Sequence, residues 1–414
     1  MTFLSSDTRL FEHLTASKRS TLLSVKPILF CLLAFALSRI ALLAIGYLAY
    51  TGQLLLPISP DQAMNKVLGN PLLDMWFAWD SNWYLTVLVE GYQATAGAEA
   101  GAGFKQANWA FFPLYPWISG ILAFVSGLSG PASLVAIANI AFFLALCLVY
   151  AEMRDLADER AARLAVILLL IWPGTHFFSS AYTEALFLLF VVLTFRLARQ
   201  KRFLGASILA AMATLTRSPG IMLVFPIAIY AWMAWAEKNN RPLNAGSGLT
   251  FTFGKSGART FAICCIPAVA LIGFMAHLHV VAGDAFAFAS VQEAWGRGFR
   301  NPLMEFARPF LAPSTIPAGQ WPDYITMWLL PVPLWMLWRQ GNRPHFVFAL
   351  ILFLLAITAG VVSLNRQMLV VFPIVAVVAV ALAQSTLMAR AFIPLASLGA
   401  LTLMAFWAAG YGVV

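Results

Sequence analysis

One short segment combines residue types that could transfer a proton next to a sugar or a lipid. At its centre stands Asp80, and aromatic and polar side chains flank it: Trp79, Ser81, Trp83 and Tyr84. A carboxylate beside apolar surface is an acceptor-only group that can take a proton from an alcohol, and the aromatic rings are platforms for a sugar or a lipid headgroup. The alternative is an interfacial helix that its tryptophan and tyrosine side chains anchor among the headgroups.

Three arginines stand where an apolar run ends or turns: Arg217, Arg297 and Arg366. Arginines at such places commonly extend to lipid headgroups. Three guanidinium groups that face one cavity would instead suit a phosphate, because guanidinium stays charged and binds phosphate through paired hydrogen bonds. Gln292 and Trp295 closely precede Arg297 and belong to the same candidate site.

A second carboxylate, Glu184, begins an apolar run two residues after Tyr182. A carboxylate at that depth is costly unless it caps the helix or faces a polar cavity. Compensation of the helix dipole explains it without any function. Tyr115 lies in a further aromatic segment, and with Trp83 and Trp295 it could stack on sugar faces or line a lipid groove.

The composition indicates the environment in which these residues work. Of the 414 residues, 61% are hydrophobic and 10% are charged, whereas soluble domains carry roughly 25% charged residues. Apolar runs of about twenty residues, the length of a membrane-spanning helix, recur along the chain. We therefore expect an all-α, polytopic integral membrane protein. The net charge of +9 reflects basic cytoplasmic loops and does not indicate a nucleic-acid partner.

Hydropathy predicts about eleven membrane-spanning helices. Their expected ranges are 27–50, 132–151, 163–178, 182–197, 203–217, 219–236, 260–282, 323–338, 345–362, 367–387 and 391–411. The basic N-terminal tail and the basic loops at 152–163 and 196–202 are expected to be cytoplasmic.

This orientation requires an odd number of crossings between the 52–110 loop, which is then outside, and residue 152. We therefore expect 111–129 to be a re-entrant or surface-lying helix. The two long outer segments are 52–130, which contains Asp80, and 283–322. The whole chain, 1–414, is expected to form one transmembrane domain.

No pattern in the sequence indicates a resident cofactor. The four cysteines lie in apolar runs without metal-ligand spacing, so free thiols are expected. No segment has the composition of a soluble nucleotide-binding domain. A divalent metal is compatible with the carboxylates but is not indicated.

Six segments together resemble the PIG-V family of mannosyltransferases, which comprises GPI mannosyltransferase 2 and its bacterial relatives and belongs to the GT-C class of glycosyltransferases. They are FAWDSNWYLTVLVEGY at 77–92, AFFPLYP at 110–116, SSAYTEALF at 179–187, ATLTRSPGI at 213–221, GDAFAFASVQEAWGR at 283–297 and NRQMLVVFP at 365–373. They occur in the family's order over most of the chain, and the 283–297 segment is similar to the bacterial branch.

The resemblance implies a GT-C helical bundle with partly embedded helices in the first outer loop. GT-C enzymes place an essential aspartate in that loop, matched here by Asp80, and often a second acidic residue further along, matched in position by Glu184. Trp83 stands where eukaryotic members often have histidine, so no role of that histidine is carried over to this chain.

Together these features predict an inverting glycosyltransferase that moves one sugar, most simply mannose, from a polyprenyl-phosphate donor to an acceptor hydroxyl. The acceptor would be a membrane lipid or another glycoconjugate at the outer face of a bacterial inner membrane. Asp80 is the expected base, and Arg366, Arg217 and Arg297 are expected to hold the donor phosphate. The sugar and the acceptor are assigned to Trp79, Ser81, Trp83, Tyr84, Tyr115, Tyr182, Glu184, Gln292 and Trp295. The alternatives are a transporter or flippase for a lipid-linked sugar and a non-catalytic scaffold subunit.

Overall fold

The computed structural model describes residues 24–54, 56–59, 61, 68–96, 99–100 and 104–412. These residues form helices joined by short turns, together with one antiparallel hairpin of two strands, β1 (Glu99–Ala100) and β2 (Phe104–Lys105). The expectation of a helical architecture is therefore confirmed.

Five of the described helical segments are long and apolar enough to cross a membrane. They are α1 (Val25–Tyr50), α5 (Gly130–Leu156), Ser218–Lys238, α11 (Lys255–Ala282) and α19 (Thr386–Ala408). The third joins the 3-10 turn η5 (Ser218–Leu223) to α9 (Val224–Lys238). Several such helices in one chain make this a multi-pass membrane protein. The predicted total of eleven crossings is not confirmed by this set.

Other predicted spans correspond to shorter helices of 13 to 16 residues. They are α6 (Glu159–Ile171), α7 (Glu184–Arg199), α8 (Phe203–Thr216), α16 (Arg343–Thr358) and α18 (Phe372–Gln384). At 1.5 Å per residue these helices are about 20–24 Å long, shorter than the hydrocarbon core of about 30 Å.

Three predicted spans are interrupted. The span expected at 323–338 is divided into α14 (Trp321–Leu329) and α15 (Pro331–Arg339), because Pro331 has no N–H to continue a helix. The span expected at 367–387 is divided into α17 (Leu364–Leu369) and α18. The span expected at 163–178 is divided into the end of α6, at Ile171, and the 3-10 turn η4 (Thr175–Phe178). Each interruption leaves non-helical backbone that can turn side chains toward a neighbour.

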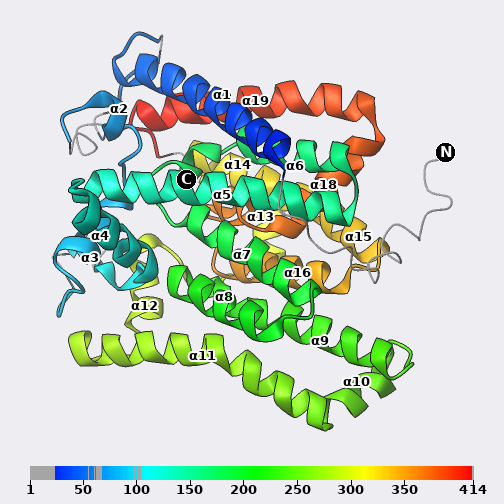
Figure 1. Cartoon of the computed structure of the whole chain (residues 1–414). Helices are drawn as coiled ribbons and strands as arrows, with labels where there is room; N and C mark the ends of the chain where they lie inside the picture. The colour runs from blue at the N-terminus through cyan, green and yellow to red at the C-terminus, as the bar shows by residue number, and fades with distance from the viewer. Residues whose placement is uncertain are drawn as a thin grey trace.

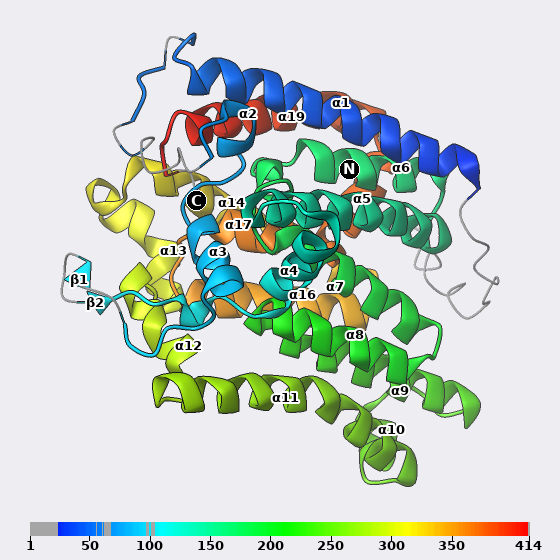
Figure 2. The same ribbon diagram turned by 60° about the vertical axis from the view of Figure 1, so that its left-hand side comes forward.

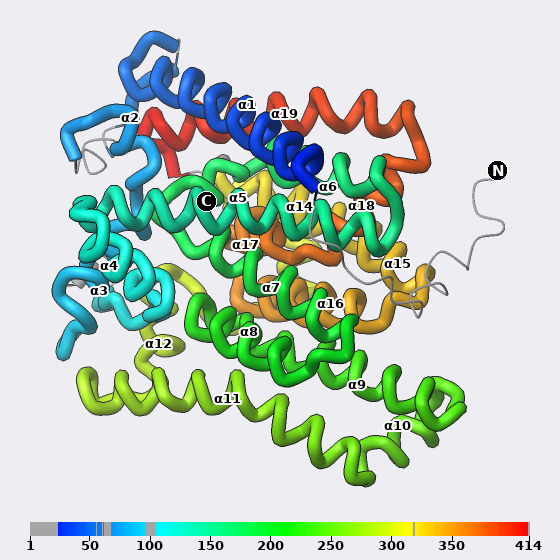
Figure 3. Tube along the Cα trace, in the orientation of Figure 1, coloured from blue at the N-terminus to red at the C-terminus, as the bar shows by residue number. Residues whose placement is uncertain are grey.

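The helices pack in layers across the bundle. α1 and α19 run side by side along one edge, and α11 lies along the opposite edge (Figures 1 and 3). Between them α5 packs on α7, α7 on α8, and α8 on α11. Because α7 has neighbours on several sides, most of its residues are buried.

Elements of both predicted outer segments lie toward one end of the bundle, at the left of Figure 2. The first segment forms α2 (Pro71–Asp74), α3 (Ser81–Val89), η3 (Asn108–Ala110) and α4 (Leu114–Ser126). The second forms α12 (Ala287–Ser290), η6 (Val291–Trp295), α13 (Pro302–Leu311), η7 (Pro313–Thr315) and η8 (Ala318–Gln320). α10 (Ala245–Thr252) lies at the other end. α4 has 13 residues, or about 20 Å, and the re-entrant or surface-lying placement of 111–129 stays a prediction.

Arg39, a charged residue inside the first predicted span, connects α1 to the turn after α6. Its guanidinium donates to Ser179 Oγ at 2.8 Å and to Thr175 Oγ1 at 3.0 Å, and it lies over the Phe142 ring at 5.2 Å. A buried charge must be compensated by hydrogen bonds, so these contacts hold the turn that leads to Tyr182 and Glu184 against the first helix.

The close packing of η5 against α8 depends on a glycine. A Cβ atom at Gly220 would lie 2.4 Å from the backbone of Ala213 and Thr214. We predict that Gly220→Ala forces the two segments apart and lowers the free energy of unfolding by about 1–3 kcal/mol, measurable as a lower thermal midpoint in detergent. Gly273→Ala in α11 is the control, since a Cβ there meets nothing within 4 Å. Equal midpoints for both variants would contradict this packing.

Candidate active site

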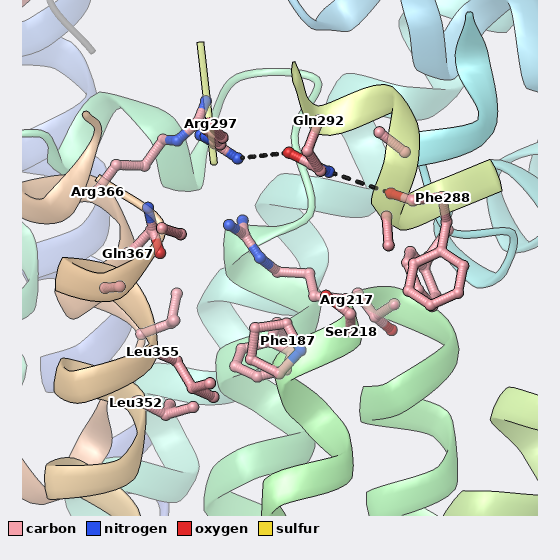
Figure 4. Close-up of a pocket in the computed structure, with 18 of the residues that line it drawn as sticks. Phe187, Arg217, Ser218, Phe288, Gln292, Arg297, Leu352, Leu355, Arg366 and Gln367 are labelled. Carbon is pink, nitrogen blue, oxygen red and sulfur yellow. Dashed lines mark hydrogen bonds between the residues drawn. The ribbon is translucent and has the colours of Figure 1, made fainter. Parts of the chain in front are cut away.

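A cavity of about 640 Å³ collects side chains from segments far apart in the sequence (Figure 4). Five charged residues line it: Asp80, Glu184, Arg217, Arg297 and Arg366. The structure thus places the three predicted phosphate-binding arginines and the two predicted carboxylates around one space. Their roles in binding or catalysis remain predictions.

Asp80 is held at the start of α3 by a strained turn. Trp79, which precedes it, has a φ of 52°, a left-handed conformation that costs a non-glycine residue about 1–3 kcal/mol. The backbone N–H of Asp80 donates to the hydroxyl of Tyr182 at 3.1 Å, and that hydroxyl donates to the carbonyl of Ala78 at 3.2 Å. Tyr182 therefore fixes the turn from both sides and directs the carboxylate of Asp80 into the cavity.

Arg366 lies between the two carboxylates. Its Nη1 atom donates to Asp80 Oδ2 at 3.2 Å, and its Nε atom is 3.5 Å from Glu184 Oε1. The guanidinium also lies over the rings of Phe177 and Tyr182, at 5.3 and 5.4 Å. Burial disfavours the charged form, but Glu184 and Asp80 outweigh burial and raise the pKa of Arg366 above its usual value. This side chain is therefore a fixed cation that orients one oxygen of Asp80.

Glu184 is fully buried and shares one oxygen between two arginines. Its Oε1 atom forms ion pairs with Arg217 and Arg366. Arg217 Nη1 also donates to Thr183 Oγ1 at 3.3 Å, and Thr183 Oγ1 lies 3.2 Å from the hydroxyl of Tyr84. Glu184 also lines the cavity, and its predicted contact with the sugar or the acceptor stays a prediction. The Oε2 atom has no hydrogen-bond partner among the described residues.

Arg297 differs from the other two arginines because its described partners are all neutral. Nη1 donates to Gln292 Oε1 at 3.3 Å and Nη2 to Ser363 Oγ at 3.5 Å, while Nε has no partner in the described part of the chain. Burial, followed by the nearby Arg366, lowers the pKa of Arg297 to about 10. It still carries its proton at neutral pH, so the cavity holds a cation that forms no ion pair with a described carboxylate, which suits an anionic ligand.

Aromatic side chains form a wall beside Asp80. Trp83 stacks on Phe111 with ring centres 5.9 Å apart, and Trp295 meets both rings edge-on at 6.0 and 5.7 Å. Tyr84 meets Phe111 edge-on at 5.0 Å. Of these four residues, Phe111, Trp295 and Tyr84 line the cavity, so the wall presents apolar ring surface next to the carboxylate.

Four residues predicted to contact the sugar or the acceptor lie outside the cavity lining: Trp79, Ser81, Trp83 and Tyr115. Tyr115 is fully buried and donates to the carbonyl of Leu134 at 2.7 Å. Ser81 is also fully buried, and Trp83 stacks on Phe111. Ser81 and Trp83 belong to α3, whereas Trp79 precedes that helix and Tyr115 lies in α4.

Sequence reasoning missed Phe111 and Asp323. Phe111 belongs to an aromatic segment that was recognised only for its tyrosine. Asp323 follows Pro322 in the first turn of α14, where an acidic residue is ordinary helix-dipole compensation. Its hydrogen bonds to Ser363 and Asn365 join segments that hydropathy treats as separate spans, and no local pattern indicates them.

Comparison with known proteins yields similarity to mannosyltransferases. Residues 110–254 match the family model described as dolichyl-phosphate-mannose-protein mannosyltransferase. GPI mannosyltransferase 2 of Schizosaccharomyces pombe is 29% identical over 203 residues, which cover 46% of this chain and 41% of that protein.

The solved structures that resemble this chain include two at low sequence identity. The oligosaccharyltransferase of Archaeoglobus fulgidus has a TM-score of 0.46 and 18% identity, with 89% of this chain and 53% of that chain covered. ArnT of Cupriavidus metallidurans bound to undecaprenyl phosphate has a TM-score of 0.45 and 14% identity, with 92% and 74% covered.

Residues 110–254 are therefore similar to a mannosyltransferase family model, in agreement with the resemblance that the motifs indicate. The segments from 77 to 373 resemble the family of GPI mannosyltransferase 2, and the comparison independently yields that protein as a relative. The chain spans less than half of that relative's length.

The shared oxygen of Glu184 leads to a prediction about stability. Glu184→Gln removes the negative charge between Arg217 and Arg366, so two neighbouring cations lose a partner they share. We expect the free energy of unfolding to fall by about 3–5 kcal/mol, as for other broken buried ion pairs, measured by thermal unfolding in detergent.

Glu305→Gln is the matched control for this measurement. Glu305 is also a buried carboxylate, but it accepts a hydrogen bond from the hydroxyl of Tyr324 at 2.8 Å and lies 3.9 Å from Arg308. A loss for Glu184→Gln no larger than for this control would show that the shared pair does not hold the site together.

Proposed function

We propose that this protein is an inverting glycosyltransferase that moves one sugar from a polyprenyl-phosphate donor to a hydroxyl of a membrane lipid or another glycoconjugate. The observation that carries the proposal is the cavity in which Asp80 is oriented by Arg366 while Arg297 donates only to neutral groups of the described residues. A base and an anion site in one space are the two requirements for displacing a sugar from a phosphate.

The charge of the cavity supports a donor with a single phosphate. Its lining has three arginines and two carboxylates, so the formal charge is 3 − 2 = +1. A polyprenyl-phosphate sugar is a phosphodiester with one negative charge, whereas a nucleotide diphosphate carries more. The arginines supply the positive charge, and the proposal therefore requires no metal or other cofactor.

The sugar and the orientation are further parts of the proposal. A family model named for dolichyl-phosphate-mannose matches this chain, which supports mannose as the sugar and a polyprenyl phosphate as its carrier. The distribution of basic loops supports a cytoplasmic N-terminus, with the cavity at the outer face of a bacterial inner membrane.

The proposed reaction uses the base and the arginines of the cavity. Arg366 holds Oδ2 of Asp80, and Oδ1 is available to accept the proton of the acceptor hydroxyl. The acceptor oxygen forms a bond to the anomeric carbon as the bond from that carbon to the phosphate oxygen breaks. The electron pair of the broken bond goes to the phosphate, which becomes a monoester, and the configuration at the anomeric carbon inverts.

The charges remain matched through this step. The phosphate gains one negative charge, and Asp80 loses its own when it takes the proton. Arg297 is already in place for the growing charge on the leaving phosphate, and preorganised groups of this kind are commonly the largest contribution to catalysis. Trp295, Tyr84 and Gln292 line the same space and can contact the sugar and the acceptor.

Replacement of the base is the direct test of catalysis. Asp80→Asn keeps the shape of the side chain but cannot take the proton, so we expect transfer from polyprenyl-phosphate mannose to fall by about 10²–10⁴-fold with donor binding retained. The assay measures transfer of labelled mannose to fractionated lipids by purified protein. Asp284→Asn, an exposed carboxylate elsewhere in the outer region, serves as the control.

Transfer at the wild-type rate by Asp80→Asn would refute the role of this carboxylate. Wild-type protein that binds the labelled donor and moves it across a vesicle membrane without transferring its sugar would instead identify a flippase. Binding with neither transfer nor movement would identify a scaffold subunit.

The anion site is tested through the donor alone. Arg297→Ala removes a cation whose charge-assisted hydrogen bonds contribute about 1.5–3 kcal/mol, so we expect the KM for the donor to rise by about 10–150-fold and the KM for the acceptor to change little. Arg300→Ala removes an exposed arginine from the same segment and should leave both values unchanged. An unchanged donor KM for Arg297→Ala would assign the phosphate to Arg217 or Arg366.

A further inference from the structure

One buried carboxylate outside the cavity holds the turn from which Arg366 projects. Asp323 lies in the first turn of α14 and is 1% exposed. Its Oδ2 atom accepts the backbone N–H of Ser363 at 3.0 Å, and its Oδ1 atom accepts that of Asn365 at 2.8 Å. Both oxygens of the carboxylate therefore bind a single turn, immediately before Arg366.

This turn requires an external anchor because its backbone is strained. Ser363 has a φ of 64°, a left-handed conformation that favours glycine. Hydrogen bonds to a carboxylate are stronger than those to neutral acceptors, and Asp323 supplies two of them on either side of Leu364. The carboxylate thus compensates for a conformation that the local sequence disfavours.

The same turn reaches both arginines at the anion side of the cavity. Arg366 is the residue after Asn365, so its backbone position depends on the hydrogen bond that the Asn365 backbone N–H donates to Asp323. Arg297 donates to the hydroxyl of Ser363 through Nη2 at 3.5 Å. One carboxylate therefore sets the positions of two guanidinium groups that come from different parts of the chain.

A second anchor acts on the turn through the side chain of Asn365. Its Nδ2 atom donates to the carbonyl of Pro173 at 3.2 Å, and its Oδ1 atom accepts from Trp172 Nε1 at 3.3 Å. This anchor fixes the turn against the end of α6. The backbone N–H of Ser363 is held separately, by Asp323.

We propose that Asp323 is a positioning residue that sets Arg297 and Arg366 for the phosphate of the donor. It does not line the cavity and acts through Ser363 and Asn365. The inference rests on the proposed function, in which the arginines of the cavity supply the positive charge for a lipid phosphate. It adds that recognition of the phosphate depends on a carboxylate that never touches it.

The experiment compares a charged and an uncharged lipid in binding to the full-length protein. Polyprenyl phosphate and polyprenol of equal chain length share the lipid and differ in the phosphate, so the ratio of their dissociation constants isolates recognition of the anion. In Asp323→Asn one oxygen remains, and the amide NH₂ faces a backbone N–H that then has no acceptor. We expect the dissociation constant of polyprenol divided by that of polyprenyl phosphate to fall by about tenfold or more, as for the loss of a charge-assisted hydrogen bond. Polyprenol binding itself should be unchanged.

A merely structural role would lower the affinity for both lipids together, along with the thermal midpoint. Glu305→Gln is the matched control, because it neutralises a buried carboxylate that binds Tyr324, the neighbour of Asp323, and it should leave the ratio unchanged. If Asp323→Asn does not fold, Asp323→Glu keeps the charge but displaces the oxygens by one methylene, and a smaller loss of the same ratio is expected.

The outcomes separate this inference from the proposed function. Wild-type protein that binds polyprenyl phosphate no better than polyprenol would overturn the proposed function and, with it, the positioning role. A wild-type preference for the phosphate that persists unchanged in the folded Asp323 variant would overturn the positioning role alone.

Discussion

The candidate site depends on one buried cation between two carboxylates. Arg366 reaches Asp80 at 3.2 Å and Glu184 at 3.5 Å, and so connects α17 to the start of α3 and to the start of α7. In a region of low dielectric such a group is stable only while its partners remain in place. The three chain segments are therefore fixed relative to one another by electrostatics at the same point where a base is needed.

Strain in the backbone occurs on both sides of this contact. Trp79 precedes Asp80, Ser363 lies shortly before Arg366, and both have positive φ. Each conformation persists because a distant side chain holds it: Tyr182 in the first case and Asp323 in the second. Strain of this kind is found where a structure needs a side chain in a position that the local sequence would not choose.

The distribution of charge supports the proposed enzyme over a transporter for a lipid-linked sugar. The cavity's five charged residues lie together around one space, whereas Arg39 within α1 binds hydroxyl and carbonyl groups of a turn. A carrier needs charged groups accessible from both sides of the bilayer. Concentration of the charges in one cavity, with Arg297 bound to neutral groups of the described residues, supports the proposed reaction, which builds negative charge at one place.

The sequence by itself determined the membrane class, the helical architecture and the residues that carry charge into the site, because hydropathy and charge are properties of local composition. The mannosyltransferase resemblance followed from short segments such as that around Asp80. Only the tertiary structure decided that Arg366 pairs with a carboxylate 286 positions away, that Tyr115 turns into the core, and that Asp323 holds the turn before Arg366. Pairings of this kind depend on how distant helices pack and where they break, which no local pattern of residues encodes.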